Sequence, residues 1–234
     1  MIPLPELITK VAIDADFMLY NVGFTSEDST EREALNRLAE WVTDIVYMNL
    51  DCEDFKAYLT PKRNFRYDIA KTVPYKSNRK GAEKPKHFDA LRKHMQGMGA
   101  ITIEGIEADD AVAIESTINL NKIWIVHVDK DLDQLEGWHY NPNKDHKYYI
   151  TAFEGYYNFY TQMLTGDRVD AIPGLKGIGP VKAIHFLYNC KTKEELHSAV
   201  LKAYTGMGHG MEYFTEQGQL LWLQRYEGDI WQPA

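Results

Sequence analysis

Acidic residues gather at four separate places in the sequence, each next to an expected strand or helix end. They are Asp14, Glu107, Asp109, Asp110, Asp129, Asp131, Asp167 and Asp170. If the fold brings these carboxylates together, cations must neutralise their charges. Ligands that are all oxygen suit Mg²⁺ or Mn²⁺ better than zinc. Two such ions about 3.5–4 Å apart can activate water and stabilise the leaving oxygen of a phosphodiester.

A basic stretch lies between positions 62 and 93, with eleven Lys or Arg residues and three acidic ones. The whole chain has a net charge of −8, so a basic stretch on an acidic body indicates a local anion-binding surface. Within it, Tyr75, Lys76 and Arg79 combine a ring that can stack on a base with cations that suit phosphates. Composition alone leaves open that the stretch is a solvated face.

A glycine-rich turn, Gly177-Ile178-Gly179-Pro180, precedes an apolar helical pattern that contains Lys182. The glycines allow a ligand to approach the backbone closely, and Pro180 suits the first position of a helix. Such a helix start binds phosphate through its N–H groups, and Lys182 adds a cation. A preceding helix is expected from about Asp167 to Pro173-Gly174. An ordinary helix–turn–helix corner is the alternative.

Apolar patterns predict the elements that position these residues. Buried strands are expected at 11–13, 55–59, 101–103 and 123–128, with a short strand at 147–151. Asp14 and Asp129 directly follow two of these strands, at the carboxyl ends where α/β sheets form their sites. Helices are expected at 31–50, 153–164, 193–204 and 211–226.

The composition is that of an ordinary globular protein. The chain has 234 residues, 44% of them hydrophobic and 26% charged, which is enough for one domain with a sizeable core or one domain plus a small lobe. Two cysteines make no disulfide framework. The N-terminus does not read as a signal peptide, and no run approaches the ~18 apolar residues of a membrane span. A cytoplasmic protein is expected.

The motifs resemble those of the flap endonuclease and 5′–3′ exonuclease family, in the family order and over about residues 11 to 190. Five blocks carry the likeness: the strand ending at Asp14, Y-K-x-N-R at 75–79, G-x-E-A-D-D at 105–110, D-K-D-x-x-Q-L at 129–135, and the segment from Gly166 through GIGPVKA. The short length and compact arch look most like the bacteriophage 5′–3′ exonucleases.

The resemblance implies an α/β fold with a mainly parallel central sheet flanked by helices on both faces, a PIN-like core. It also implies a basic arch segment at about 62–95 and a helix-hairpin-helix motif that binds DNA. The expected organisation is a nuclease core over 1–165, followed by the helix-hairpin-helix and C-terminal helices over 166–234.

The resemblance further implies a metal-dependent 5′–3′ exonuclease and 5′ flap endonuclease of DNA replication, repair or recombination. The eight acids would bind two Mg²⁺ or Mn²⁺ ions, Lys76 and Arg79 would face the scissile phosphate, and Tyr75 would stack on the terminal base. Gly177, Gly179 and Lys182 would grip duplex phosphates, with a K⁺ ion at the hairpin. The partner would be DNA with a 5′ end, flap or nick, with an RNA–DNA hybrid left open. The protein would be a monomer that does not bind membranes. It would act in the host cytoplasm if a phage encodes it.

One departure from the family pattern stands out. After its second strand the family usually places an aspartate, but here Thr60-Pro61-Lys62 follows and the next acid is Asp68. A hydroxyl is a poorer ligand for a hard cation than a carboxylate. Weak binding is therefore expected for the one of the two metal ions that this aspartate would help to bind. A branched-DNA-binding module with weak or no nuclease activity therefore stays open. A PIN-type ribonuclease is a second alternative, which should lack the hairpin.

Overall fold

The computed structural model describes residues 8–79, 81 and 83–233, and these form two compact units. The sheet unit comprises the described residues of 1–62, 82–129 and 137–149, and the helical unit those of 63–81, 130–136 and 150–234. Each unit has a hydrophobic core of its own. The chain enters the helical unit three times, whereas the sequence predicted one boundary at 165/166, which stays a prediction.

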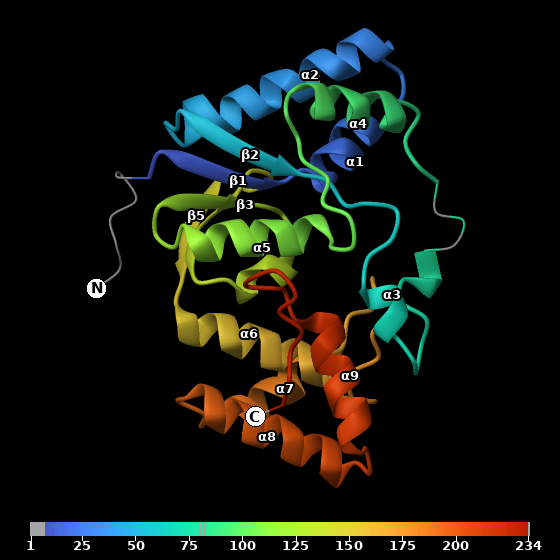
Figure 1. Ribbon diagram of the computed structural model, residues 1–234, viewed down its shortest axis with the longest axis vertical. Helices are drawn as coiled ribbons and strands as arrows, with labels where there is room; N and C mark the ends of the chain where they lie inside the picture. The colour runs from blue at the N-terminus through green and yellow to red at the C-terminus, as the bar shows by residue number, and fades with distance from the viewer. Residues whose placement is uncertain (1–7, 80, 82, 234) are drawn as a thin grey trace. The chain divides into compact units, whose positions relative to one another are not determined.

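Five strands in the order β2-β1-β3-β4-β5 build the sheet unit (Figure 1). Their bounds are Lys10–Asp14 for β1, Asp54–Tyr58 for β2, Ile123–Val126 for β3, Gly137–Asn141 for β4 and His146–Ile150 for β5. β1 pairs in parallel with β2 and β3, and β3 pairs in parallel with β4. Only four residues join β4 to β5, a length that fits an antiparallel hairpin and not a parallel crossover. The predicted mainly parallel sheet is confirmed, with the strand at 123–126 at its centre.

The parallel register brings three strand ends to one edge of the sheet. Asp14 lies opposite Tyr58 of β2, and Ile13 lies opposite Val126 of β3. Val11 to Asp14 of β1 and all of β3 are buried, because helices cover both faces of a largely parallel sheet. Residues that directly follow β1, β2 and β3 therefore leave the sheet at the same edge.

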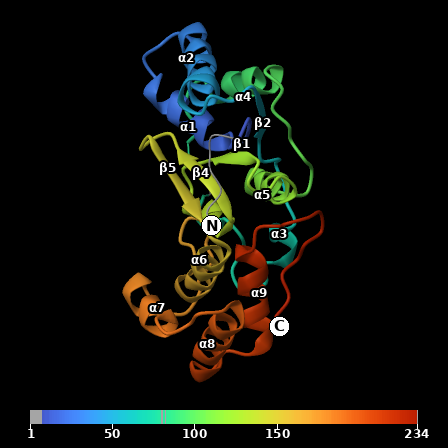
Figure 2. The same ribbon diagram turned by 90° about the vertical axis from the view of Figure 1, so that its left-hand side faces the viewer.

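Helices cover the sheet on both faces (Figure 2). The helices α1 (Asp16–Thr25), α2 (Glu31–Thr43) and α4 (Phe88–Gly97) share one core with the Val11 and Ile13 face of β1. Helix α5 (Ala108–Ile118) packs on the opposite face, against β1, β2 and β3. A π-helical segment, η2 (Asp44–Asn49), continues α2, so the helix predicted at 31–50 is confirmed.

The helical unit is organised around α6 (Ala152–Thr165), whose buried face contacts η4 (Lys130–Gln134) and three further helices. These are α7 (Pro180–Leu187), α8 (Lys193–Gly206) and α9 (Met211–Leu221). Two short segments, α3 (Arg66–Ile69) and η3 (Ser77–Arg79), lie in the basic stretch. No helix in the described part of the chain is long and apolar enough to span a bilayer.

Three predicted elements were wrong. The strand expected at 101–103 is a single bridge between Ile101 and Tyr58. Helix α9 stops at Leu221 and not at 226, because Trp222 is extended and the carbonyls of Leu220 and Trp222 bind Arg66. The helix expected from Asp167 is absent: residues 167–172 form a turn closed by mutual backbone hydrogen bonds between Asp167 and Ile172.

Candidate metal and phosphate sites

Asp14 is the centre of the carboxylate cluster in the sheet unit. It ends β1, it is 6% exposed, and its Oδ1 accepts a hydrogen bond from the Asp16 N–H at 3.1 Å. Burial raises the pKa of Asp14 well above its usual value, and the charges of Asp16 and Asp129 raise it further. The Asp16 N–H and a hydrogen bond with Asp109 act in the opposite direction. A divalent cation would relieve this crowding of like charges.

Acids at the start of α5 cap that helix. The carboxylate of Glu107 accepts the backbone N–H of Asp110, and Asp110 Oδ2 accepts the N–H of Glu107 at 3.1 Å. This arrangement satisfies two N–H groups that a helix start would otherwise leave unpaired. Asp110 is fully buried, while Asp109 points to Asp14. Asp110 thus has a structural role, and a ligand role for these three acids stays a prediction.

Thr60 lies just past β2, where the family resemblance places an acid. Its N–H donates to Asp16 Oδ2 at 3.1 Å, and its hydroxyl accepts the N–H of Ala108 at 2.9 Å. Its carbonyl accepts a hydrogen bond from Arg92 Nη2 at 2.8 Å. The neutral side chain therefore joins the end of β2 to the first turn of α5, beside Glu107.

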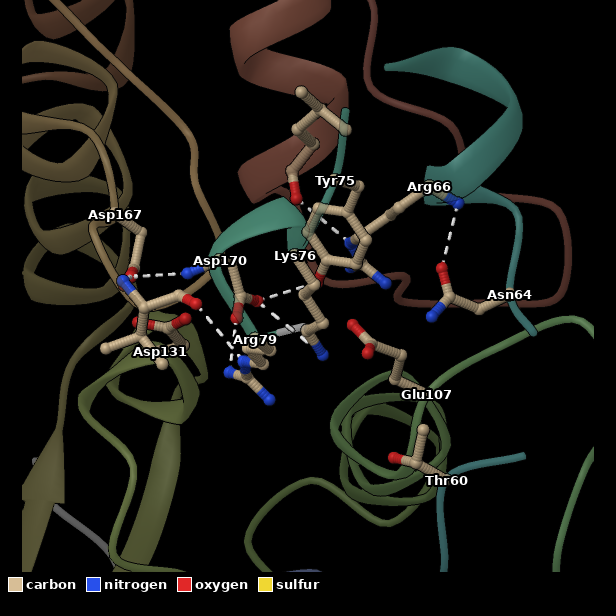
Figure 3. Close-up of polar contacts among 12 residues, drawn as sticks. Thr60, Asn64, Arg66, Tyr75, Lys76, Arg79, Glu107, Asp131, Asp167 and Asp170 are labelled. Atoms are coloured by element: carbon tan, nitrogen blue, oxygen red, sulfur yellow. Dashed lines mark hydrogen bonds and ion pairs between the residues drawn. The ribbon is translucent and has the colours of Figure 1, made fainter. Parts of the chain in front are cut away.

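In the helical unit, Asp170 binds the basic segment (Figure 3). Its Oδ2 accepts the Tyr75 hydroxyl at 2.6 Å and lies 3.7 Å from Lys76 Nζ, and its Oδ1 pairs with Arg79 Nη2. The Asp170 carbonyl also accepts the Lys76 N–H at 2.9 Å, which fixes Lys76 in the left-handed region at φ 53°. One carboxylate thus holds all three residues that were predicted to contact the substrate near its 5′ end.

Tyr75 is 4% exposed and belongs to the core of the helical unit. Its ring packs edge-on against Tyr67 with centroids 5.4 Å apart, and Lys76 Nζ lies 5.0 Å from its centre. In this conformation the ring does not face solvent. Stacking on a base, which the resemblance implies for Tyr75, would require the ring to leave this packing.

Asp167 and Asp131 are held by neighbours within the helical unit. Asp167 Oδ2 pairs with Lys130 Nζ at 3.1 Å, and Oδ1 accepts the N–H groups of Val169 at 2.6 Å and Asp170 at 3.2 Å. Burial acts to raise the pKa of Asp167, but Lys130 and these N–H groups outweigh it and lower that pKa. The two bonds to the backbone form a turn in place of the predicted helix. Asp131 accepts a hydrogen bond from the Gln162 amide.

The glycine-rich turn is confirmed as the start of α7. Gly177 has a φ of 79°, and Pro180 occupies the first turn of the helix. Gly177 and Gly179 are exposed, and a Cβ at either would meet no atom within 4 Å. Lys182 is also exposed, and its Nζ donates to the Gly177 carbonyl at 2.8 Å. The backbone here is accessible to a ligand such as phosphate.

The donor set fits a hard divalent cation, because every predicted ligand is a carboxylate. The sheet unit contains Asp14, Glu107, Asp109, Asp110 and Asp129, and the helical unit contains Asp131, Asp167 and Asp170. In the sheet unit the structure brings Asp109 and Asp129 within electrostatic reach of Asp14. In the helical unit it brings Asp167 and Asp170 into one turn.

Sequence analysis missed three residues that support these clusters. Asp16 and Arg92 hold Thr60, and Arg66 is buried with its guanidinium on two carbonyls at the end of α9. His127 is buried, and its Nδ1 lies 2.6 Å from the Asp129 carbonyl. Only Asp16 gave a usable signal, as the second acid of Asp14-Ala15-Asp16 after a strand. Arg92 and Arg66 depend on contacts with residues far away in sequence.

No family model matches the sequence, and no curated protein matches it. Solved structures do match. The flap endonuclease of bacteriophage T5, in complex with DNA and metal ions, is 14% identical with a TM-score of 0.66, covering 91% of this chain and 88% of that chain. The T5 5′-exonuclease with bound zinc is 16% identical with a TM-score of 0.62, covering 91% and 89%. The catalytic core of Rad2 with a DNA substrate is 14% identical with a TM-score of 0.53, covering 94% and 74%. The chain has the fold of these proteins.

Proposed function

We propose that this protein is a member of the flap endonuclease and 5′–3′ exonuclease family that hydrolyses phosphodiester bonds in DNA. The supporting observation is the set of acids at the ends of β1 and β3 and the start of α5, in a fold shared with the T5 and Rad2 nucleases. In open α/β sheets, sites form at these carboxyl ends.

Divalent cations, two Mg²⁺ or Mn²⁺ ions, are part of this proposal. Asp14, Glu107, Asp109, Asp110 and Asp129 would be the ligands from the sheet unit, and Asp110 would also hold Glu107 in place. Asp131, Asp167 and Asp170 would be the ligands from the helical unit. When bound, such ions supply an activated water and stabilise the leaving oxygen of the phosphodiester.

The helical unit would supply the contacts to DNA. Lys76 and Arg79, held together by Asp170, would stabilise the charge that develops on the scissile phosphate. The exposed backbone at Gly177 and Gly179, with Lys182, would grip duplex phosphates, and a K⁺ ion can bind at this turn. The substrate would be DNA with a 5′ end, flap or nick, or an RNA–DNA hybrid. A monomer that acts in the cytoplasm during replication, repair or recombination is the expected setting.

A second candidate is a branched-DNA-binding module with little or no nuclease activity. It is favoured by Thr60, which gives a neutral hydroxyl where the resemblance places an acid. A PIN-type ribonuclease is disfavoured because it should lack the helix-hairpin-helix, whereas this chain has a glycine-rich turn followed by α7.

A 5′-labelled DNA flap incubated with Mg²⁺ tests the proposal. Small labelled products are expected from the wild-type protein, whereas a retarded but intact substrate would identify the binding module. An RNA duplex in parallel tests the ribonuclease.

Asp129→Asn and Asp131→Asn should each abolish cleavage and spare DNA binding, because they remove a ligand charge and leave the phosphate contacts. Asp28→Asn, at an exposed acid between α1 and α2, is the control. Near-normal turnover of either variant in Mg²⁺ would contradict the assignment.

A further inference from the structure

Asp16 is the acid nearest to Asp14 in sequence, and the predicted ligand set does not contain it. It begins α1, and its N–H donates to Asp14 Oδ1 at 3.1 Å. Its own carboxylate accepts the N–H of Thr60 through Oδ2 at 3.1 Å. One residue therefore connects the acid at the end of β1 with the main chain at the end of β2.

The end of β2 is the place that lacks an acid. The hydroxyl of Thr60 is neutral and already accepts the N–H of Ala108 at the start of α5. The carboxylate of Asp16 therefore lies at the backbone of the very position that would otherwise carry the charge. Asp16 is also joined directly to Asp14, because its N–H donates to Asp14 Oδ1.

Arg92 fixes this arrangement. Its Nη2 donates to the Thr60 carbonyl at 2.8 Å, and its Nη1 lies 3.7 Å from Asp16 Oδ1. The Asp16 and Arg92 side chains are 27% and 25% exposed, so solvent and ions can reach them. Asp16 could have a purely structural role, in which its ion pair with Arg92 connects α1 to α4. The experiment must distinguish this structural role from a role in metal binding.

We propose that Asp16 replaces the acid missing from the end of β2 and supplies the negative charge with which the sheet unit binds its divalent cation. This deepens the proposed function and rests on it, because the cation is the one that a nuclease of this fold would need. Affinity for a hard cation rises with the number of ligand charges around it, and residues beside the ligands tune it as well.

Mn²⁺ binding to the full chain without DNA, measured by calorimetry, tests the proposal. Asp16→Asn removes the charge but keeps an oxygen that can accept the Thr60 N–H. It should weaken Mn²⁺ binding about 10- to 100-fold, as loss of a residue supporting a metal ligand does. Asp54→Asn makes the same change at the exposed, opposite end of β2 and should leave binding unchanged.

Transferring the negative charge from position 16 to position 60 gives a sharper test. The double variant Asp16→Asn with Thr60→Asp should regain most of the lost Mn²⁺ affinity. Thr60→Asp alone should tighten Mn²⁺ binding and shift a Mg²⁺ activity titration to lower concentration. In EDTA, Asp16→Asn should change the melting temperature little, because asparagine keeps an acceptor for the Thr60 N–H and the lost ion pair with Arg92 is partly exposed. The rise in melting temperature on adding Mn²⁺ should shrink.

Three results would overturn the inference: a folded Asp16→Asn that binds Mn²⁺ like wild type, a double variant without recovery, or a lower melting temperature in EDTA with an unchanged Mn²⁺ effect. If wild type itself binds no Mn²⁺, the metal chemistry of the proposed function fails together with it. If Mn²⁺ binding depends on Asp16 but no DNA is cut, the inference stands and the nuclease activity fails.

Discussion

Several acidic residues that are predicted metal ligands also stabilise the local structure around them. Asp170 holds Tyr75, Lys76 and Arg79, while Asp110 caps α5 and Asp167 shapes a turn. A carboxylate accepts several hydrogen bonds at once, so one residue can orient cationic side chains and still present an oxygen to an ion. Substitution of such an acid therefore has two separable consequences, one on stability and one on metal binding.

Lys76 is the sharpest single-residue test of catalysis. Because Asp170 positions its ammonium group, Lys76→Ala should lower the single-turnover rate by roughly 10²-fold or more, as loss of one preorganised donor does. The rate is measured at saturating protein on a 5′-labelled flap. Lys71→Ala, an exposed lysine of the same basic stretch, is the control. If Lys76→Ala weakens binding only and keeps the saturated rate, Lys76 belongs to a solvated face.

Asp167 should give stability a defined dependence on pH. Its pKa is lowered in the fold, so its stabilisation is complete above the unfolded-state pKa of about 3.9 and is lost as pH falls through the lower folded-state value. Asp167→Asn keeps the acceptor for Val169 but loses the charge opposite Lys130. We expect a loss of about 1–2 kcal/mol at neutral pH, modest because Lys130 is exposed.

Urea unfolding in EDTA at pH 7 and near pH 3 measures this. The wild-type and Asp167→Asn curves should differ at neutral pH and converge in acid. An equal gap at both pH values would mean that the Asp167 charge contributes nothing.

Among the elements, the turn before α7 depends on open space above its backbone. Gly179 lacks the positive φ of Gly177, so Gly179→Val blocks phosphate approach without straining the chain. Duplex affinity should fall by about 1.5–3 kcal/mol, the value of a lost hydrogen bond to a charged group. The loss should be the same for different sequences, since phosphate contacts carry no base information.

Gly206→Val is the matched control, because this glycine of α8 also has open space around its Cβ position. Fluorescence anisotropy with two unrelated duplexes measures both variants. An unchanged affinity for Gly179→Val, with the fold intact, would remove the turn from the DNA-binding surface.

Arg66 joins the basic stretch to the C-terminal end of α9 within the helical unit. It is 2% exposed, with its Nε on the Leu220 carbonyl at 2.9 Å and its Nη2 on the Trp222 carbonyl at 2.8 Å. Arg66→Ala should destabilise the protein by about 3 kcal/mol or more, because two buried carbonyls lose their donor. Arg63→Ala removes an exposed ion pair with Asp68 and a cation–π contact with Tyr67, and should cost only about 1 kcal/mol. Equal effects in urea unfolding would contradict this difference.

For the whole molecule, the uneven charge predicts how DNA binding responds to salt. A net charge of −8 repels DNA, so binding must come from local cations and helix starts, which release counterions. Duplex affinity should fall about 10³-fold or more between roughly 50 and 200 mM salt if six or more phosphates are contacted. Lys182→Ala should reduce the slope of log K against log salt by about one. A flat salt response would exclude a phosphate-based interface.

Local patterns were sufficient for much of the fold. β1, β3, α2, α6 and α8 were predicted from apolar periodicity, because each buries a face that the sequence marks at its period. The strand β4 was not predicted. Residues 167–172 were wrongly predicted to be helical. Their conformation depends on the Asp167 side chain, which accepts backbone N–H groups and so competes with helix formation. Spacing along the chain does not report such competition.

The sequence by itself determined which residue types are available: carboxylates after buried strands, cations with aromatics between 62 and 93, and an exposed glycine turn before a helix. The family resemblance of its motifs also implied the mainly parallel sheet that the structure shows. Only the tertiary structure decided what each side chain is bonded to. Asp16 reaches Thr60, and Tyr75 turns into a core, because contacts between residues distant in sequence depend on strand register and helix packing. Strand register and helix packing depend on how the whole chain buries its apolar surface, so they cannot be predicted from a local sequence pattern.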